Sequence, residues 1–204
     1  MPRTPPNTAR KRPRQERAQA TVDAILDATA HILVRDGYDN LSTNRVAQRA
    51  GVSIGSLYQY YPNKEALVGE LVDRYSAMLF DMVIQALATM QDAEPRHVAS
   101  SLVRAMIETK RAQPTLAKVL REQIPRTGRL ARYEEELAKV IALAGAFLTR
   151  HRALLRVDDV QIAAFVAVHM VDALTHASVT QDRSEDEVMV VQITDAVTRY
   201  LLRD

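Results

Sequence analysis

The chain has 204 residues, of which 47% are hydrophobic and 25% are charged, so it can build one domain or two small ones and is not a disordered tail. It contains no cysteine, which excludes disulfides, thiolate zinc sites and cysteine-based covalent catalysis. The formal net charge is only +2, but residues 1–65 hold ten basic and six acidic side chains, so positive charge gathers in the N-terminal third.

Apolar residues recur at helical spacing along nearly the whole chain, and no stretch alternates strictly with a period of two. The pattern predicts an all-α protein of about nine helices. Gly37 and Gly51 end the first two helices, Ser53 begins the third, and Pro62 breaks it. The expected ranges are 17–36, 43–50, about 53–61, 63–90, 95–112, 114–124, 129–153, 158–180 and 184–203.

The first twenty residues are basic and lack the apolar segment of a signal peptide, and the longest apolar run, Val140–Leu148, has nine residues. A membrane-spanning helix needs about 18 residues. We therefore expect a cytoplasmic protein without a membrane partner. The positive N-terminal third favours a polyanionic partner, although a basic solubilising tail would carry the same charge.

Residues 42–61 hold two short helices joined by Gly51-Val52-Ser53, placed behind a longer first helix and after a basic arm, which is typical of a helix-turn-helix. The run reads Thr43-x-x-Val46-Ala47-x-x-Ala50-Gly51-Val52-Ser53-x-Gly55-x-Leu57-Tyr58-x-Tyr60-Tyr61-x-x-Lys64-Glu65-x-Leu67. Over residues 17–68 this sequence resembles the DNA-binding region of the TetR family of bacterial transcriptional regulators.

The resemblance implies a ligand-responsive repressor that binds a palindromic operator as a homodimer and is released by a small, often apolar, inducer. It implies three parts: a basic flexible arm over 1–16, a DNA-binding domain over 17–65, and a ligand-binding and dimerisation domain over 66–204. The last two predicted helices would pair with their copies, through two apolar stripes. These are Ile162, Val166, Ala173 and Ala177 on one helix, and Val190, Ile193, Val197, Tyr200 and Leu201 on the other.

The third helix has one face for packing and one for binding. On a helical wheel Leu57 and Tyr61 point inward, while Gly55 and Gln59 lie on the opposite side. Arg45 and Lys64 lie at helix starts, where a bound phosphate would offset the unfavourable position of a cation, and a solvated surface is the alternative. For Tyr58 and Tyr60 we expect DNA contact, with packing as the alternative. The candidate DNA-binding residues are Thr43, Arg45, Ser53, Ile54, Gly55, Ser56, Tyr58, Gln59, Tyr60 and Lys64.

The central helices supply residues for an effector cavity of modest size, although the apolar members of this set fit a plain core equally well. Three polar members, His169, Asp172 and His176, share one face of the predicted helix 158–180 with Phe165 and line either the cavity or the subunit seam. The candidate ligand-binding residues are Tyr75, Leu79, Met82, Met106, Leu120, Phe147, Phe165, His169, Asp172 and His176.

Motifs of enzymes are absent: the sequence has no phosphate loop, no Gly-x-Ser-x-Gly and no His-Glu-x-x-His. We expect neither catalysis nor a cofactor nor a metal. Two alternatives stay open. One is an architectural or constitutive repressor without ligand sensing, and the other is a helical metal-binding protein or enzyme that uses His169, Asp172 and His176.

Overall fold

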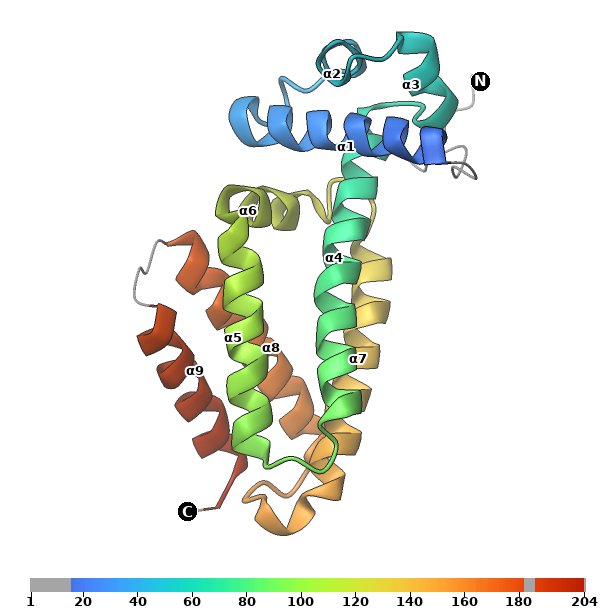
Figure 1. Cartoon of the computed structure of the whole chain (residues 1–204). Helices are drawn as coiled ribbons and strands as arrows, with labels where there is room; N and C mark the ends of the chain where they lie inside the picture. Colours follow the sequence, from blue (N-terminus) through green and yellow to red (C-terminus); the bar gives the residue numbers. More distant parts are fainter. Residues whose placement is uncertain (1–15, 182–185, 204) are drawn as a thin grey trace. The chain divides into compact units, whose positions relative to one another are not determined.

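The computed structural model describes residues 16–181 and 186–203, and these residues form nine α-helices (Figure 1). The expected all-α fold is confirmed, and each predicted helix is present with ends within about three residues of the prediction. Residues 1–15 of the predicted basic arm lie outside the described residues. The helices are α1 Glu16–Asp36, α2 Thr43–Ala50, α3 Ile54–Tyr60, α4 Lys64–Thr89, α5 Pro95–Ala112, α6 Pro114–Gln123, α7 Leu130–Arg150, α8 Val160–Thr180 and α9 Asp186–Leu201.

The described chain forms two compact units. The first holds the residues up to Ser76 together with Lys118–Ala131, and the second holds Ala77–Ala117 and the residues from Arg132 onward. Helix α4 contributes its first half to one unit and its second half to the other. The division therefore differs from the predicted boundary at residue 65, because the first half of α4 and residues 118–131 belong to the same compact unit as the N-terminal helices.

In the first unit α1 packs against α2, and α2 packs against α3. Gly37 ends α1 with a φ of 77°, and its N–H donates to the carbonyl of Leu33 at 3.1 Å, as the sequence predicts for a left-handed helix end. The apolar spacing that predicted these helices forms the core of the unit. Its buried members are Val22, Ile25, Leu26, Ala28, Ile32, Leu33, Leu41, Val46, Ala47, Leu57, Tyr60, Tyr61, Ala66, Leu67, Val68 and Val72.

Residues 118–131 are tied to the first unit by Arg129. Its Nε donates to Asp73 Oδ2 at 3.0 Å, and both side chains are mostly buried, at 12% and 17% exposure. The guanidinium lies against α4 at Gly69, where a Cβ atom would stand 2.6 Å from Arg129 Nη2. Only glycine at position 69 leaves room for this contact without a shift of Arg129.

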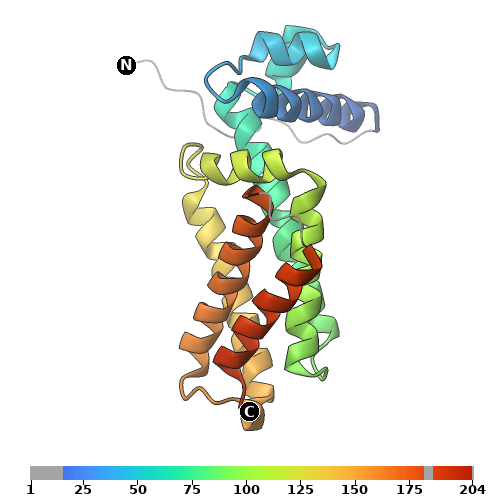
Figure 2. The same cartoon turned by 90° about the vertical axis from the view of Figure 1, so that its left-hand side faces the viewer.

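In the second unit α5 packs against both α8 and α9, and Figure 2 shows α8 and α9 side by side. Four residues of the stripe predicted for dimerisation on α9 are buried within the single chain, at 2–6% exposure: Val190, Ile193, Val197 and Leu201. This corrects the sequence interpretation. The helix has one strong apolar stripe, and the chain itself buries it against α5 and α8.

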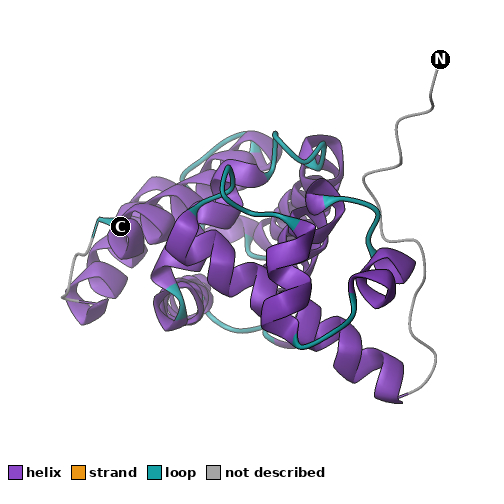
Figure 3. Cartoon of the chain, turned by 90° about the horizontal axis from the view of Figure 1, so that it is seen from above, coloured by secondary structure: helices purple, strands orange, loops and turns teal. Residues whose placement is uncertain are grey.

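A short antiparallel bridge binds the end of α9 to the segment that follows α7. Arg156 N donates to Leu201 O and Arg203 N donates to Leu154 O, each at 2.9 Å, on either side of the Leu155 and Leu202 pair. Leu155 is fully buried. Within the described residues no β-strand forms, and Figure 3 shows helices joined by loops.

Helix α8 is long and apolar enough to cross a membrane by length and composition, which corrects the expectation drawn from uninterrupted apolar runs. One such helix is weak evidence, because core helices of soluble proteins pass the same test. Only 33% of its most apolar window is buried in the chain, and Ile162 and Phe165 are 60% and 52% exposed. This helix therefore has an outward apolar face.

The inward stripe of α9 yields a stability prediction. Ile193→Ala should lower the free energy of unfolding by about 2–5 kcal/mol, because it removes a buried side chain from the core of the second unit. Lys139→Ala on α7 of the same unit, where the side chain is 61% exposed, should change it by less than about 0.5 kcal/mol. Urea denaturation at one protein concentration measures both, and equal losses would contradict this packing.

Candidate functional site

Two serine caps and one glycine fix the start of α2 and the turn between α2 and α3. Ser42 Oγ accepts from the backbone N–H of Arg45 at 3.4 Å, and Ser53 Oγ accepts from that of Ser56 at 3.0 Å. Gly51 ends α2 with a φ of 67°. Neither helix has an acidic residue in its first turn. The local sequence therefore specifies this turn, as predicted.

Helix α3 presents one face outward. Leu57 and Tyr61 are buried at 0% and 2% exposure, as the wheel predicted, and Tyr58 is 41% exposed. Across the turn, Thr43 Oγ1 of α2 lies 3.1 Å from Tyr58 Oη, so two predicted DNA-binding residues meet. The exposed residues on this side are Ser53, Ile54, Gly55, Tyr58 and Gln59.

Tyr60 differs from Tyr58, although the sequence interpretation treated them alike. It is 9% exposed and lies in the core of the first unit. Its ring is held by packing, because position 60 follows Leu57 on the inward side of α3. Tyr60 is therefore not part of the outward face.

Gly55 has little around it within the chain. The nearest heavy atom to a Cβ built there is Ser53 Oγ, at 3.8 Å. The hydroxyls of Ser53 and Ser56 lie 2.8 Å apart beside it. The outward face of α3 is thus lined by hydroxyls around a position without a side chain, where another molecule can approach the helix backbone closely.

Lys64 is the first residue of α4, directly after the capping residue Asn63, whose Oδ1 accepts from Ala66 N at 2.8 Å. The Lys64 Nζ donates to the carbonyl of Tyr38 at 3.3 Å and lies 4.5 Å from the centroid of the Tyr38 ring. Burial, together with the Glu65 carboxylate that accepts from the Tyr38 hydroxyl at 3.1 Å, raises the pKa of Tyr38 to about 12. The Lys64 ammonium group therefore lies over the ring of Tyr38, and Glu65 holds that ring in place through its hydroxyl.

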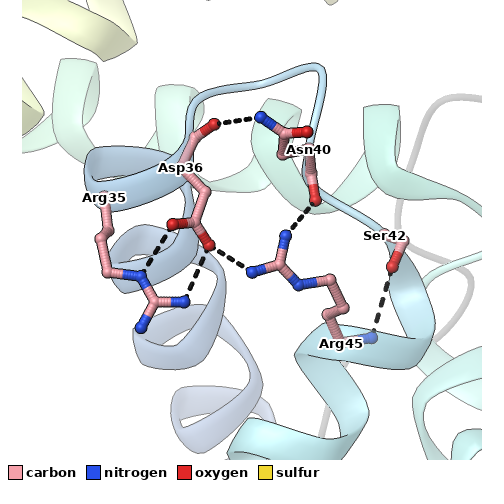
Figure 4. A network of polar contacts seen from close by, with 5 residues as sticks. All are labelled: Arg35, Asp36, Asn40, Ser42 and Arg45. Carbon is pink, nitrogen blue, oxygen red and sulfur yellow. Dashed lines mark hydrogen bonds and ion pairs between the residues drawn. The ribbon is translucent and has the colours of Figure 1, made fainter.

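Arg45 does not stand as an unpaired cation at the start of α2, which corrects the electrostatic expectation. Its guanidinium pairs with the Asp36 carboxylate and donates to the carbonyl of Asn40 at 2.7 Å (Figure 4). The penalty of a cation at a helix N-terminus is thus offset within the chain.

The predicted effector residues are divided between the two units. Tyr75 and Leu120 belong to the first unit and the others to the second. Met106 and Phe147 are buried at 6% and 8%, while Phe165 is 52% exposed and is not a core residue of this chain. The partly buried members are Tyr75, Leu79 and Met82, and Met82 Sδ accepts from Thr109 Oγ1 at 3.7 Å.

The polar face predicted on α8 is split. His169 is exposed, with its ring 4.1 Å from that of Phe165, so it does not line a cavity within this chain and only a seam between copies would cover it. Asp172 turns inward, and its Oδ1 accepts from Lys110 Nζ at 3.1 Å. His176 is partly buried. Within the described residues no group of three or more His, Asp or Glu side chains is arranged to hold a metal ion.

Lys110 is a polar residue that the sequence interpretation missed. It is 2% exposed, and its Nζ also donates to Thr175 Oγ1 at 2.9 Å and to the carbonyl of Asp172 at 3.3 Å. The available signal was its position, three residues after Ile107 on the buried stripe of α5. A buried ammonium needs such partners, so Lys110 holds α5 to α8.

Two family models match the chain. Residues 25–71 match the model described as bacterial regulatory proteins, tetR family, and residues 94–201 match the model described as tetracyclin repressor-like, C-terminal domain. The second match alone covers more than half of the chain.

Sequence relatives agree with these models. The nucleoid occlusion factor SlmA of Pasteurella multocida is 29% identical over 126 residues, which are 61% of this chain and 57% of that protein, so the chain spans less than two thirds of it. The DNA-binding transcriptional repressor TetR of Mycobacteroides abscessus is 26% identical over 200 residues, covering 92% of this chain and 96% of that one.

The fold has close counterparts among solved structures. NalD, described as the secondary repressor of the MexAB-OprM multidrug efflux pump in Pseudomonas aeruginosa, superposes with a TM-score of 0.72 at 19% identity. The superposition covers 93% of this chain and all of that one. At this identity the likeness concerns the fold.

The sparse surroundings of Gly55 yield a prediction for a pair of glycines. Gly55→Ala should leave the free energy of unfolding unchanged or raise it by up to about 1 kcal/mol, because the methyl makes only an ordinary van der Waals contact with Ser53 Oγ and alanine suits a helix. Gly51→Ala should lower it by about 1–2 kcal/mol, because φ is positive there. Thermal and urea unfolding measure both, and a destabilised Gly55→Ala protein would show that the methyl has no room.

Proposed function

The chain belongs to the tetR family of bacterial regulatory proteins, whose members are DNA-binding transcriptional regulators, and we propose that it is a ligand-responsive repressor. It binds a two-fold symmetric operator as a homodimer in the cytoplasm, and a small apolar molecule releases it. The single observation that carries the DNA-binding part is the outward face of α3, held in place by two serine caps and by the Thr43 and Tyr58 hydroxyls.

In this proposal α3 enters the major groove, as the second helix of a helix-turn-helix does. Gly55 lets the helix backbone approach, Ile54 and Gln59 meet base edges, and the hydrogen-bonded hydroxyl pair of Thr43 and Tyr58 donates its remaining proton to a phosphate. The hydroxyls of Ser53 and Ser56 add polar groups to the same face of α3. Lys64 adds a cation at the edge of this surface. Two copies of α3 would occupy successive grooves about 34 Å apart.

The dimer is proposed to form through the outward face of α8 and α9. Large apolar side chains are exposed there in the single chain, which is favourable only when another surface covers them. They are Ile162, Phe165 and Leu174 on α8 and Val188 and Val191 on α9. This interface keeps the two predicted helices but replaces the buried α9 stripe by its outward residues.

The effector is proposed to bind in the second unit, among α4, α5, α7 and α8. Support comes from the resemblance to the family and from Leu79 and the flexible Met82, which are apolar and only partly buried. Helix α4 is continuous from Lys64 to Thr89 and has residues in both units, so a shift of its second half changes the position of its first. A coupling of about 1–3 kcal/mol is enough for a useful response.

A second candidate function is favoured by the likeness to the nucleoid occlusion factor SlmA. In that case the chain binds DNA without sensing a ligand, and the second unit only dimerises. A metal-binding protein or enzyme built on His169, Asp172 and His176 has little support, because Asp172 pairs with Lys110 and His169 points outward.

Operator selection followed by footprinting tests the proposal. A pool of random duplexes should yield a palindrome of about 15–30 base pairs, protected by the dimer over both half-sites. A panel of apolar small molecules should contain at least one that removes the protection. Selection of no common sequence contradicts the repressor proposal, while protection that no compound changes favours the constitutive alternative.

A lysine variant tests the phosphate contact. Lys64→Ala should weaken binding to all duplexes and lower the slope of log affinity against log salt by about one unit, because one phosphate contact is lost. Lys139→Ala in α7, whose side chain is 61% exposed, is the control and should change neither. Affinities measured between low and moderate salt decide this, and an unchanged slope for Lys64→Ala would remove Lys64 from the interface.

An aspartate on α8 tests the dimer. Phe165→Asp should give monomers and reduce operator affinity, because a carboxylate would be buried in an apolar seam. The fold should persist, because the side chain is 52% exposed in the single chain. Leu143→Asp on α7, at 40% exposure, is the control and should remain dimeric. Analytical ultracentrifugation and circular dichroism measure these outcomes, and a fully dimeric Phe165→Asp protein would refute the interface.

A further inference from the structure

Asp36, the last residue of α1, holds two arginines with one carboxylate (Figure 4). Arg35 donates from Nε to Oδ1 at 2.8 Å and from Nη2 to Oδ2 at 2.9 Å, which is a bidentate pair. Arg45, from the first turn of α2, contacts the same Oδ2. Two positive charges are therefore held by a single negative one.

The backbone of the turn completes the network. Asn40 Nδ2 donates to the carbonyl of Asp36 at 2.8 Å, and the carbonyl of Asn40 accepts from Arg45 Nη1 at 2.7 Å. Arg45 is therefore bound at both ends of the turn that joins α1 to α2. The geometry fixes where its guanidinium points and which groups it contacts.

The carboxylate of Asp36 stays charged over the whole physiological range. The hydrogen bond from Arg35 is the main cause that lowers the pKa of Asp36 to about 2, with Arg45 adding to it against the opposing effect of desolvation. Both arginine side chains are nevertheless accessible, at 58% and 41% exposure. Without Asp36 they would be free to turn toward another anion.

The position of Arg45 links this network to the proposed DNA-binding surface. Arg45 lies in the helix that carries Thr43, and Thr43 meets Tyr58 on the outward face of α3. A guanidinium is a strong ligand for backbone phosphate, and phosphate contacts raise affinity for every sequence alike. Two unpaired guanidinium groups here would thus strengthen binding to random DNA without improving the reading of bases.

Resting on the proposed DNA-binding function, we infer that Asp36 is a positioning residue that withholds Arg35 and Arg45 from phosphate. By keeping both groups on its own carboxylate and on the turn, Asp36 limits affinity for random duplexes and so raises the ratio of operator binding to random binding. This role differs from a direct phosphate contact by Arg45.

Removal of the carboxylate tests the inference. Asp36→Asn should raise affinity for random duplex DNA about tenfold at low salt and steepen the salt slope by about one to two units, because up to two guanidinium groups become available. Affinity for the selected operator should rise less, so the ratio of operator to random binding falls. The salt slopes for random duplex DNA and for the operator are both measured on the full chain by fluorescence anisotropy.

Asp23→Asn is the matched control. Asp23 lies on the same helix, thirteen residues away or about 20 Å along the axis, and pairs with Arg74 Nη1 at 2.9 Å. Both variants remove one acidic charge that is paired with arginine, so a general charge effect is equal in the two. Equal slopes for the two variants would overturn the inference.

Arg45→Gln keeps the test decisive if Asp36→Asn weakens the fold. In the wild-type background it should leave the salt slope unchanged, and a slope lowered by about one unit would overturn the inference by showing that Arg45 already contacts phosphate. In the Asp36→Asn background, Arg45→Gln should remove about half of the increase in salt slope that Asp36→Asn causes. If the wild-type chain binds no duplex at all, the proposed function itself fails, which is a separate outcome from equal slopes.

Discussion

The complete burial of the start of α4 is the constraint on which the DNA-binding unit depends. Ala66, Leu67 and Val68 are consecutive and all 0% exposed, so this turn of the helix is covered on every side. One residue later, Gly69 leaves room for Arg129, which is held by Asp73. The N-terminal helices and a segment from beyond residue 117 therefore close around one helix, and α3 is presented from that base.

The charges of this unit are mostly committed to contacts within it. Arg45 and Arg35 share the carboxylate of Asp36, and Lys64 lies over the ring and carbonyl of Tyr38. The two guanidinium groups on Asp36 are therefore not equivalent to free cations on the surface. The outward face of α3 instead offers hydroxyls and a glycine, which suits a close fit to a groove more than simple attraction to a polyanion.

The second unit shows how a helix divides its apolar residues between the core and the exposed surface of the chain. The strong stripe of α9 packs inside, and a weaker set of apolar residues on α8 and α9 stays outside. Lys110 and Asp172 join α5 to α8 within the same unit. Residues that look alike in a periodic pattern, such as Val190 and Val191, therefore have opposite roles, with exposures of 3% and 47%.

Sequence alone determined the helices, their approximate ends and the two faces of α3 except for the buried Tyr60, because caps, left-handed glycines and wheel positions such as those of Ser53, Gly51 and Leu57 act within a few residues. The partners of Arg45, the contact of Arg129 with Gly69 and the inward stripe of α9 were decided only by the tertiary structure. Periodicity reveals that a face is apolar or a side chain charged. It does not reveal which distant surface covers it, because that choice depends on how all the helices pack at once.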